Sequence, residues 1–176
     1  MRDKEHHMHP RVVIVMGVSG VGKSAVGRLL AAQLGAAFHD ADDFHPPANV
    51  ERMRAGVPLT DDHRAPWLAA LRGLVETTLA GPDRAAIVLA CSALKHAYRE
   101  RLGGGLPGVR LVHLDGDPEL IRRRIAARRD HFMPASLLDS QLATLERPGP
   151  DERPIVVDVA GSPEAIVAAI LRELAC

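Results

Sequence analysis

Apolar and polar residues follow one another along the chain in blocks whose lengths fit strands and helices. Five short apolar runs have strand length, at 11–16, 36–39, 85–91, 109–114 and 155–158. Continuous apolar runs of this length are typical of strands that are buried on both faces of a parallel sheet. Longer segments with helical spacing separate them. The pattern predicts an α/β domain with a five-stranded parallel sheet and right-handed crossovers.

The clearest helix follows the first strand. Val26, Leu29, Leu30 and Leu34 recur at intervals of three and four, and Gly35 gives a stop signal. Helical pieces are also expected around 48–55 and 62–80. Two further helices open on an N-cap residue followed by proline, Asp117-Pro118 and Ser162-Pro163.

The composition indicates how many domains the chain forms and which kinds of partner it binds. The chain has 176 residues with 47% apolar content, which suffices for one domain at 11–176 behind a flexible N-terminal tail at 1–10. Its 22 basic and 22 acidic residues cancel, so we expect no nucleic-acid or membrane partner. Without a signal peptide or an apolar run of the ~20 residues that span a bilayer, we expect a soluble cytoplasmic protein. A homodimer stays open.

The stretch GVSGVGKS directly after the first strand fits the phosphate-loop pattern GxxxxGK[ST]. Backbone N–H groups of such a loop surround a phosphate at a helix N-terminus, Lys23 reaches the β- and γ-phosphates, and the Ser24 hydroxyl can hold Mg²⁺. A plain glycine turn is the alternative, but the flanking strand and helix supply the context that the motif requires. We predict that ATP is bound by Gly17, Val18, Ser19, Gly20, Val21, Gly22, Lys23, Ser24 and Ala25.

Two common classes of phosphate-loop protein do not fit the rest of the chain. A switch GTPase needs an NKxD, which is absent, and the single DxxG at 158–161 follows the last strand. A motor ATPase usually carries an acidic residue after the third strand, where this chain has Cys91 and Ser92. A small-molecule kinase remains, with a non-catalytic ATP-binding regulator as the alternative from another class.

An acidic cluster follows the second strand. Asp40, Asp42 and Asp43 fall within four positions, at the edge where the carboxyl ends of parallel strands gather ligands. Three carboxylates this close repel one another unless a cation or substrate hydroxyls use them. We expect one to be the catalytic base and favour Asp42, which is also a candidate Mg²⁺ ligand. A capping and turn role is the alternative for each.

Two groups of basic residues can bind anions. Lys95 and Arg99 lie one helical turn apart and can anchor a small anion, unless they belong to a solvated helix face. Further on, five arginines fall within 122–129, and Arg124 and Arg128 lie four positions apart. Such a run is unfavourable on one helix, so we expect it to stabilise a transferring γ-phosphoryl group. The alternative is a surface helix whose arginines pair with nearby carboxylates, Glu119 and Asp130.

The motifs together resemble the gluconokinase family of P-loop small-molecule kinases. The resemblance rests on GVSGVGKS, DADDFHPPANVERMRAGVPLTDDHRAPWL, ACSALKHAYRERL and RRDHFMPASLLDSQLATLERP in this order, and it covers about 12–158. One departure is Ala41, where glycine is expected before the Asp pair.

The resemblance implies a three-layer fold like that of nucleoside monophosphate kinases and shikimate kinase, with a substrate-binding helical region and a mobile lid at about 129–146. It implies ATP-dependent phosphorylation of D-gluconate at O6, and the alternative is a kinase for a shikimate-like or nucleoside monophosphate acceptor. Arg124 and Arg128 would belong to the lid and its base, and 159–163 would lie near the adenine. The implied acceptor-binding residues are Asp42, His45, Asn49, Arg64, Lys95 and Arg99.

Overall fold

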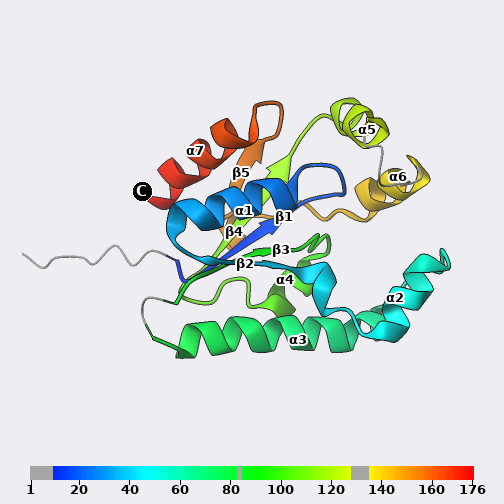
Figure 1. The fold of residues 1–176 in the computed structure, drawn as a ribbon, viewed down its shortest axis with the longest axis horizontal. Helices are drawn as coiled ribbons and strands as arrows, with labels where there is room; N and C mark the ends of the chain where they lie inside the picture. Colours follow the sequence, from blue (N-terminus) through cyan, green and yellow to red (C-terminus); the bar gives the residue numbers. More distant parts are fainter. Residues whose placement is uncertain (1–9, 83–84, 128–134) are drawn as a thin grey trace, which may run out of the picture.

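Five parallel strands form one sheet in the order β2-β3-β1-β4-β5 (Figure 1). The computed structural model describes residues 10–82, 85–127 and 135–176. Every neighbouring pair of strands is parallel, as the sequence predicts. The strands are β1 (Val12–Met16), β2 (Ala37–Asp40), β3 (Ile87–Ala90), β4 (Val109–Asp115) and β5 (Ile155–Asp158).

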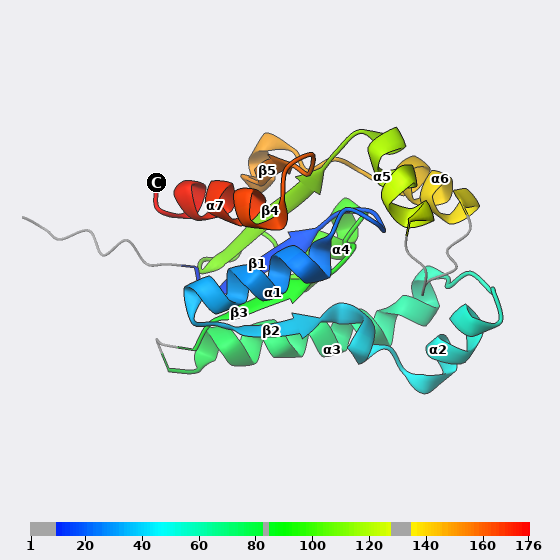
Figure 2. The same ribbon diagram turned by 45° about the horizontal axis from the view of Figure 1, so that its top comes forward.

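Helices cover both faces of this sheet, which gives the expected three layers. The helices α1 and α7 lie on one face, and α3 and α4 lie on the other (Figure 2). The helices are α1 (Lys23–Leu34), α2 (Pro47–Arg54), α3 (Asp61–Ala80), α4 (His96–Leu102), α5 (Pro118–Ala126), α6 (Ala135–Thr144) and α7 (Pro163–Leu174). Short 3₁₀ turns form η1 (Ala41–Phe44) and η2 (Pro150–Glu152).

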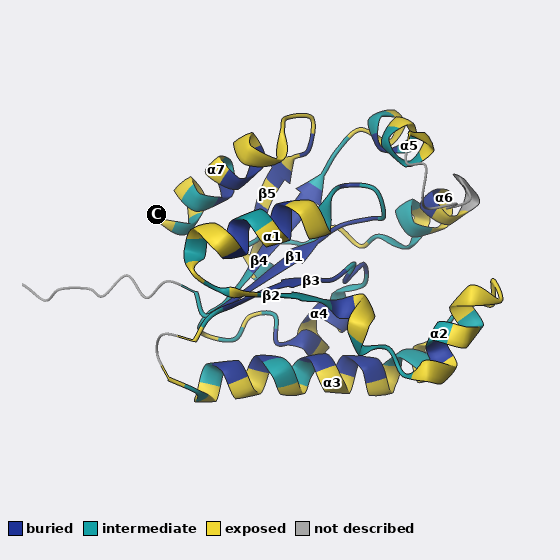
Figure 3. Cartoon of the chain, in the orientation of Figure 1, coloured by how far each residue is buried: buried dark blue, intermediate teal, exposed yellow. Residues whose placement is uncertain are grey.

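The central strand β1 divides the core between the two faces. Its five residues are all buried, and successive side chains point to opposite sides of a sheet. Val13 and Val15 pack in the cluster that includes α1 and α7, whereas Ile14 and Met16 pack with α3. Burial on both sides explains why the strand is apolar without alternation, and the dark core between the helices is visible in Figure 3.

Local signals set most helix ends where the sequence places them. Asp117 caps α5 and Ser162 caps α7 through side-chain oxygens that accept backbone N–H groups, and Gly35 ends α1 in the left-handed conformation. The helix α3 begins one residue earlier than expected, because Thr60 caps it and forms a capping box with His63.

Some predicted features lie outside the described residues. These are the N-terminal tail except residue 10, Arg128, Asp130 and the first part of the lid at 129–134. In the part of the chain that the structure describes, no helix is long and apolar enough to cross a membrane.

Candidate active site

The carboxyl ends of β1, β2 and β3 lie side by side at one edge of the sheet. The phosphate loop leaves β1, the acidic cluster follows β2, and the turn at 91–95 follows β3. Three segments that are distant in sequence therefore meet at this edge. Figure 1 shows α2, α5 and α6 beyond the same end of the sheet.

The phosphate loop depends on glycine. Gly17, Gly20 and Gly22 have φ angles of 148°, 88° and 95°, which side chains rarely adopt. A Cβ on Gly17 would lie 2.7 Å from the Leu114 carbonyl oxygen, so the space is also missing. The loop leads directly into α1, whose first residue is Lys23. Its amides thus lie at a helix N-terminus, where an anion is stabilised.

Asp40 connects the acidic cluster to the phosphate loop. Its Oδ2 accepts a hydrogen bond from Ser24 Oγ at 2.9 Å, and its Oδ1 accepts one from the Asp42 backbone N–H at 3.1 Å. Sequence reasoning expected Ser24, with Asp42 as the second candidate, on the metal side. The structure instead brings Asp40 into contact with Ser24.

This Ser24–Asp40 pair fits a magnesium nucleotide. Within the described segments, no group of three His, Cys, Asp or Glu side chains forms a ready metal cage. Mg²⁺ does not need one, since it is usually held by one or two protein oxygens together with water and substrate phosphates. A hydroxyl and a carboxylate beside the phosphate loop are suitable ligands of this kind.

Asp42 differs from Asp40 in its surroundings. It lies on the rim of the site, open to solvent, yet nearby protein atoms displace enough water to raise the pKa of its carboxyl group. The charge of Asp40 raises this pKa further, whereas His45 and Lys23 oppose the effect. A carboxylate with a raised pKa is a better proton acceptor than an ordinary one.

His45 is held in place by stacking. Its ring lies parallel to the Trp67 ring with centroids 4.4 Å apart, and Trp67 Nε1 donates to the Ala41 carbonyl at 2.7 Å. Burial lowers the pKa of His45 and thereby favours its neutral form, although the charge of Asp42 opposes this effect. Its Nδ1 is buried and has no hydrogen-bond partner among the described atoms, which favours the tautomer with the proton on Nε2.

Asn49 and Arg64 make structural contacts near the expected acceptor site. Asn49 is buried, and its Nδ2 donates to the His63 carbonyl at 2.7 Å, which joins α2 to α3. Arg64 donates to the Leu59 carbonyl at 2.6 Å, and its guanidinium carbon lies 5.8 Å from the centre of the Tyr98 ring. Their roles as acceptor-binding residues stay predictions.

Lys95 lies in a cluster of polar side chains that joins α3 to α4. Its Nζ is 3.3 Å from Asp61 Oδ1 and 5.3 Å from the centre of the Tyr98 ring. The Tyr98 hydroxyl also donates to Asp61. Hydrogen bonds from Tyr98 and then Lys95 lower the pKa of Asp61, and the bond to Asp61 raises the pKa of Lys95. Arg64 completes the cluster, 3.9 Å from the same carboxylate oxygen.

The side chain of Arg99 is only 1% exposed, and its expected anion-binding role stays a prediction. Its guanidinium forms a two-point ion pair with Glu152, with distances of 2.6 and 2.9 Å. It also donates to the carbonyls of Ala93 and Leu94 at 3.0 and 3.2 Å. Arg99 therefore braces the turn that carries Lys95.

Two arginines of α5 lie in different surroundings. Arg122 pairs with Glu119 on its own helix, a carboxylate that the surface-helix alternative names, and with Asp139 on α6. Arg124 lies partly exposed in the last turn of α5, and its role at the γ-phosphate stays a prediction.

Some residues of the site were not singled out by sequence reasoning. Asp61 and Tyr98 lie in motifs that were recognised, but only the fold shows that they meet Lys95. The signal for Trp67 is that the single tryptophan of the chain follows the acidic cluster. Gln141 makes a contact with the phosphate loop that no local pattern predicts.

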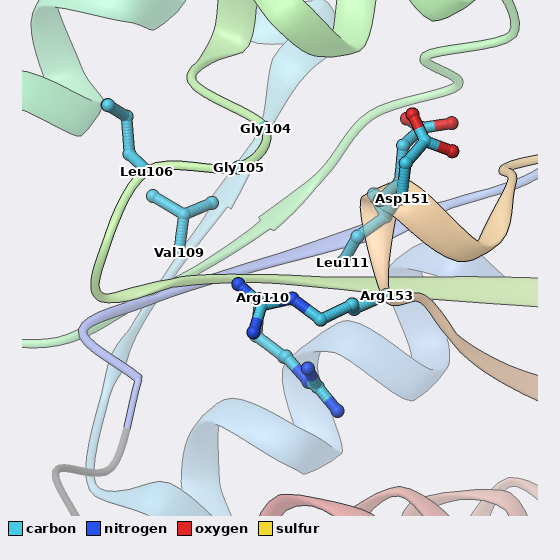
Figure 4. A pocket seen from close by; sticks show the side chains of 9 residues that line it. Gly104, Gly105, Leu106, Val109, Arg110, Leu111, Asp151 and Arg153 are labelled. Carbon is cyan, nitrogen blue, oxygen red and sulfur yellow. The ribbon is translucent and has the colours of Figure 1, made fainter.

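A separate pocket lies away from this site. It is lined by residues of β4, the loop before β4 and the η2 turn, including Arg110, Asp151 and Arg153 (Figure 4). Its β4 residues are at the amino end of the strand, whereas the phosphate loop lies at the carboxyl ends. None of the predicted site residues lines it.

Comparison with known proteins identifies the family of the chain. A family model described as an AAA domain matches residues 12–148. The gluconokinase of Gluconobacter oxydans is 48% identical over 166 residues, covering 94% of this chain and 92% of the relative. The thermoresistant gluconokinase of Escherichia coli is 41% identical over 168 residues, covering 95% and 93%.

Solved structures confirm the expected fold. The crystal structure of a gluconokinase from Sinorhizobium meliloti superposes with a TM-score of 0.83 at 45% identity, covering 95% of this chain and 93% of that one. A shikimate kinase from Aquifex aeolicus shares the fold alone, with a TM-score of 0.56 at 20% identity over 93% of this chain and 96% of that one. The chain has the AAA domain and belongs to the gluconokinase family.

Proposed function

We propose that the protein phosphorylates D-gluconate at O6 with ATP and releases 6-phosphogluconate and ADP. The observation that carries the proposal is that two half-sites, the phosphate loop for the nucleotide and the segment around Asp42 and Lys95 for the acceptor, lie at one edge of the sheet. A phosphate loop with Lys23 and Ser24 lies beside Asp42, whose pKa is raised, and relatives more than 40% identical over nearly the whole chain are named gluconokinases.

The chemistry needs one proton transfer and one phosphoryl transfer. Asp42 accepts the proton of the O6 hydroxyl while O6 bonds to the γ-phosphorus, and the bond from that phosphorus to the β–γ bridging oxygen breaks. The ADP oxygen keeps that bonding pair. Lys23 balances the charge on the phosphates, and Arg124 of α5 and Arg128 are the candidates for binding the transferring group. Holding the reactants in line is the main contribution of the protein.

Mg²⁺ would be held by the Ser24 hydroxyl and, directly or through water, by Asp40. Bound there, the ion supplies positive charge to the phosphate oxygens. The contact between Ser24 and Asp40 supports this assignment in place of Asp42, which is left free to accept the proton.

The carboxylate of gluconate would bind at the opposite end of the acceptor site. Lys95, Arg64 and the Tyr98 hydroxyl all face the Asp61 carboxylate, so this cluster already binds an anionic group of the right chemistry. We infer that Asp61 shares or yields these donors when the acceptor binds.

An acceptor screen tests the proposal. ADP release is measured with gluconate, shikimate and nucleoside monophosphates, and turnover should be found with gluconate. Turnover with another acceptor alone would assign a different small-molecule kinase, and binding of ATP without turnover of any acceptor would assign a regulator. The variant Lys23→Ala should nearly abolish turnover while it keeps the native circular dichroism spectrum. The absence of nucleic-acid and membrane partners, a cytoplasmic location and an assembly of two chains stay predictions.

A further inference from the structure

The helix α6 reaches the phosphate loop through a two-point contact. Gln141 Oε1 accepts the Ser19 backbone N–H at 2.6 Å, and Gln141 Nε2 donates to Ser19 Oγ at 3.0 Å. A primary amide that meets both the backbone and the side chain of one residue fixes the position and the orientation of that residue. Ser19 immediately precedes the glycine at the tip of the loop, so its position influences the amides that face the phosphates.

Five residues further on, the same segment reaches the acceptor side. The Glu146 backbone N–H donates to the Leu94 carbonyl at 2.8 Å, and its carboxylate accepts the His96 backbone N–H at 2.7 Å. Leu94 and His96 flank Lys95 in the chain. Both neighbours of the candidate acceptor-binding lysine are therefore held by one residue.

The segment between these contacts packs against the core through two leucines. Leu142 and Leu145 are partly buried against the cluster that contains Val18 and Val21 of the phosphate loop, and Leu138, one turn before Gln141 on α6, is fully buried in that cluster. Two hydrogen-bonded ends and an apolar middle make the stretch a stiff connection. Its ends lie on the two half-sites.

We propose that residues 141–146 form a strap that couples the nucleotide site to the acceptor site, with Gln141 and Glu146 as positioning residues. Nucleotide binding orders the phosphate loop, the strap transmits this order to the Leu94–His96 turn, and Lys95 is fixed for the acceptor. Thermodynamic linkage requires the reverse effect to be equal. The effect of the strap on acceptor binding rests on the proposed function, whereas the effect of nucleotide binding on the Leu94–His96 turn does not.

The first experiment measures the coupling directly. The dissociation constant of a non-hydrolysable ATP analogue is determined by calorimetry with and without saturating gluconate. In the wild type we expect gluconate to lower the dissociation constant of the analogue by a factor of about five or more, within the usual range of coupling between two sites. In Gln141→Ala this coupling factor should fall to about one. Gln33→Ala, at the other glutamine of the chain, is the matched control and should keep the wild-type factor, because Gln33 is exposed and remote from the strap. Unchanged coupling in Gln141→Ala would overturn the proposal.

The acceptor end of the strap is tested by a conservative pair of variants. Glu146→Ala removes the acceptor of the His96 N–H and should abolish the coupling, whereas Glu146→Gln keeps a side-chain oxygen there and should retain it. A role in stability alone would lower the melting temperature of both variants and leave the coupling factor intact. That outcome would contradict the strap.

A second readout needs no acceptor. Backbone hydrogen exchange at His96 and Glu146 should slow about tenfold when the ATP analogue binds to the wild type, and it should not slow in Gln141→Ala. If gluconate fails to bind the wild type, the proposed function fails, but this exchange experiment still decides the strap. Equal protection of these two amides in wild type and variant would rule the strap out.

Discussion

Two neighbouring carboxylates of the site differ in what surrounds them. Asp40 accepts hydrogen bonds from Ser24 and the Asp42 backbone, while desolvation and the charge of Asp40 raise the pKa of Asp42. A base must be deprotonated, so activity should fall as the pH drops through this raised pKa. We expect the acid limb of the profile of kcat/KM against pH to lie above the ordinary aspartate value of about 3.9.

Replacing Asp42 by Asn should remove the proton acceptor and lower kcat by about 10² to 10⁴. The affinity for an ATP analogue should change less than threefold, because Ser24 and Asp40 remain. Asp43→Asn is the matched control, since that carboxylate is adjacent and exposed, and kcat should stay near the wild-type value. Steady-state kinetics and calorimetry check the prediction, and a large loss of analogue affinity in Asp42→Asn would place Asp42 on the metal side.

The cluster around Asp61 predicts opposite effects for two of its members. Lys95→Ala removes a cation that would bind the acceptor carboxylate, and it should raise the KM for gluconate about tenfold, the effect of one charge-assisted hydrogen bond. Asp61→Asn removes the competing internal carboxylate and should lower this KM. Arg101→Ala, on the exposed face of α4, should leave it unchanged. A rise of KM in Asp61→Asn would mean that Asp61 binds the acceptor itself.

At the residue scale, the sequence predicts roles that depend on local spacing and misses roles that depend on distant partners. Lys23 and Ser24 follow from a motif with a fixed strand and helix around it. The ion pair of Arg99 cannot be predicted in this way, because its partner Glu152 is 53 positions away. The spacing of four from Lys95 indicates only a shared helix face. Arg99 is buried because of the way η2 packs, and helical periodicity in the sequence does not predict that packing.

At the scale of a single turn, the contacts of Arg99 with the turn at 91–95 should contribute to the free energy of unfolding. The Ala93 residue of this turn has a φ of 44°, an unfavourable conformation for a residue with a side chain, and Arg99 donates to its carbonyl. Arg99→Met would leave that carbonyl and the Glu152 carboxylate without their guanidinium partner. Loss of one member of a buried pair costs about 3 to 5 kcal/mol in the free energy of unfolding, measurable by urea denaturation. The exposed Arg101→Met on the same helix should cost less than about 0.5 kcal/mol.

Two helical glycines predict opposite effects of one substitution. Gly73 is exposed in α3, and outside its chain neighbours and its own helix backbone no described atom lies within 4 Å of an added Cβ. Gly73→Ala should therefore stabilise the protein by about 0.5 to 1 kcal/mol. Gly27 in α1 faces β2, and an added Cβ would lie 2.7 Å from Phe38 Cε2. The resulting overpacking should cost about 1 to 3 kcal/mol and outweigh the helix gain. Denaturation of both variants checks this, and equal stabilisation would show that Phe38 yields freely.

Elements themselves were largely predictable, since their ends depend on local caps. Asp117, Ser162 and Gly35 mark helix ends in the sequence and in the structure. Strand β3 covers only Ile87–Ala90 of the apolar run at 85–91, and Cys91 already belongs to the turn toward the site. Burial raises the pKa of the Cys91 thiol to about 12.

On the scale of the whole molecule, the alternation of strands and helices predicts a parallel sheet but not which strands are neighbours. The pairing of β1 with both β3 and β4 places the phosphate loop in the middle of the sheet, with the acidic cluster on one side. The phosphate loop and the acidic cluster therefore follow strands of one continuous sheet. The binding of nucleotide to one of them should stabilise the entire fold.

Thermal unfolding tests this prediction. A ligand that binds only the native state adds about 2.7 kcal/mol at 100 times its dissociation constant, and about 1 kcal/mol corresponds to roughly 2 to 4 °C for a domain of this size. ATP with Mg²⁺ at that concentration should therefore raise the melting temperature by about 5 to 10 °C. Lys23→Ala should melt near the wild-type temperature without nucleotide and lose most of this shift, whereas Gln33→Ala on the exposed side of the same helix should keep it. A full shift in Lys23→Ala would mean that the loop binds nucleotide through its backbone amides alone, and that Lys23 acts only in the transfer step.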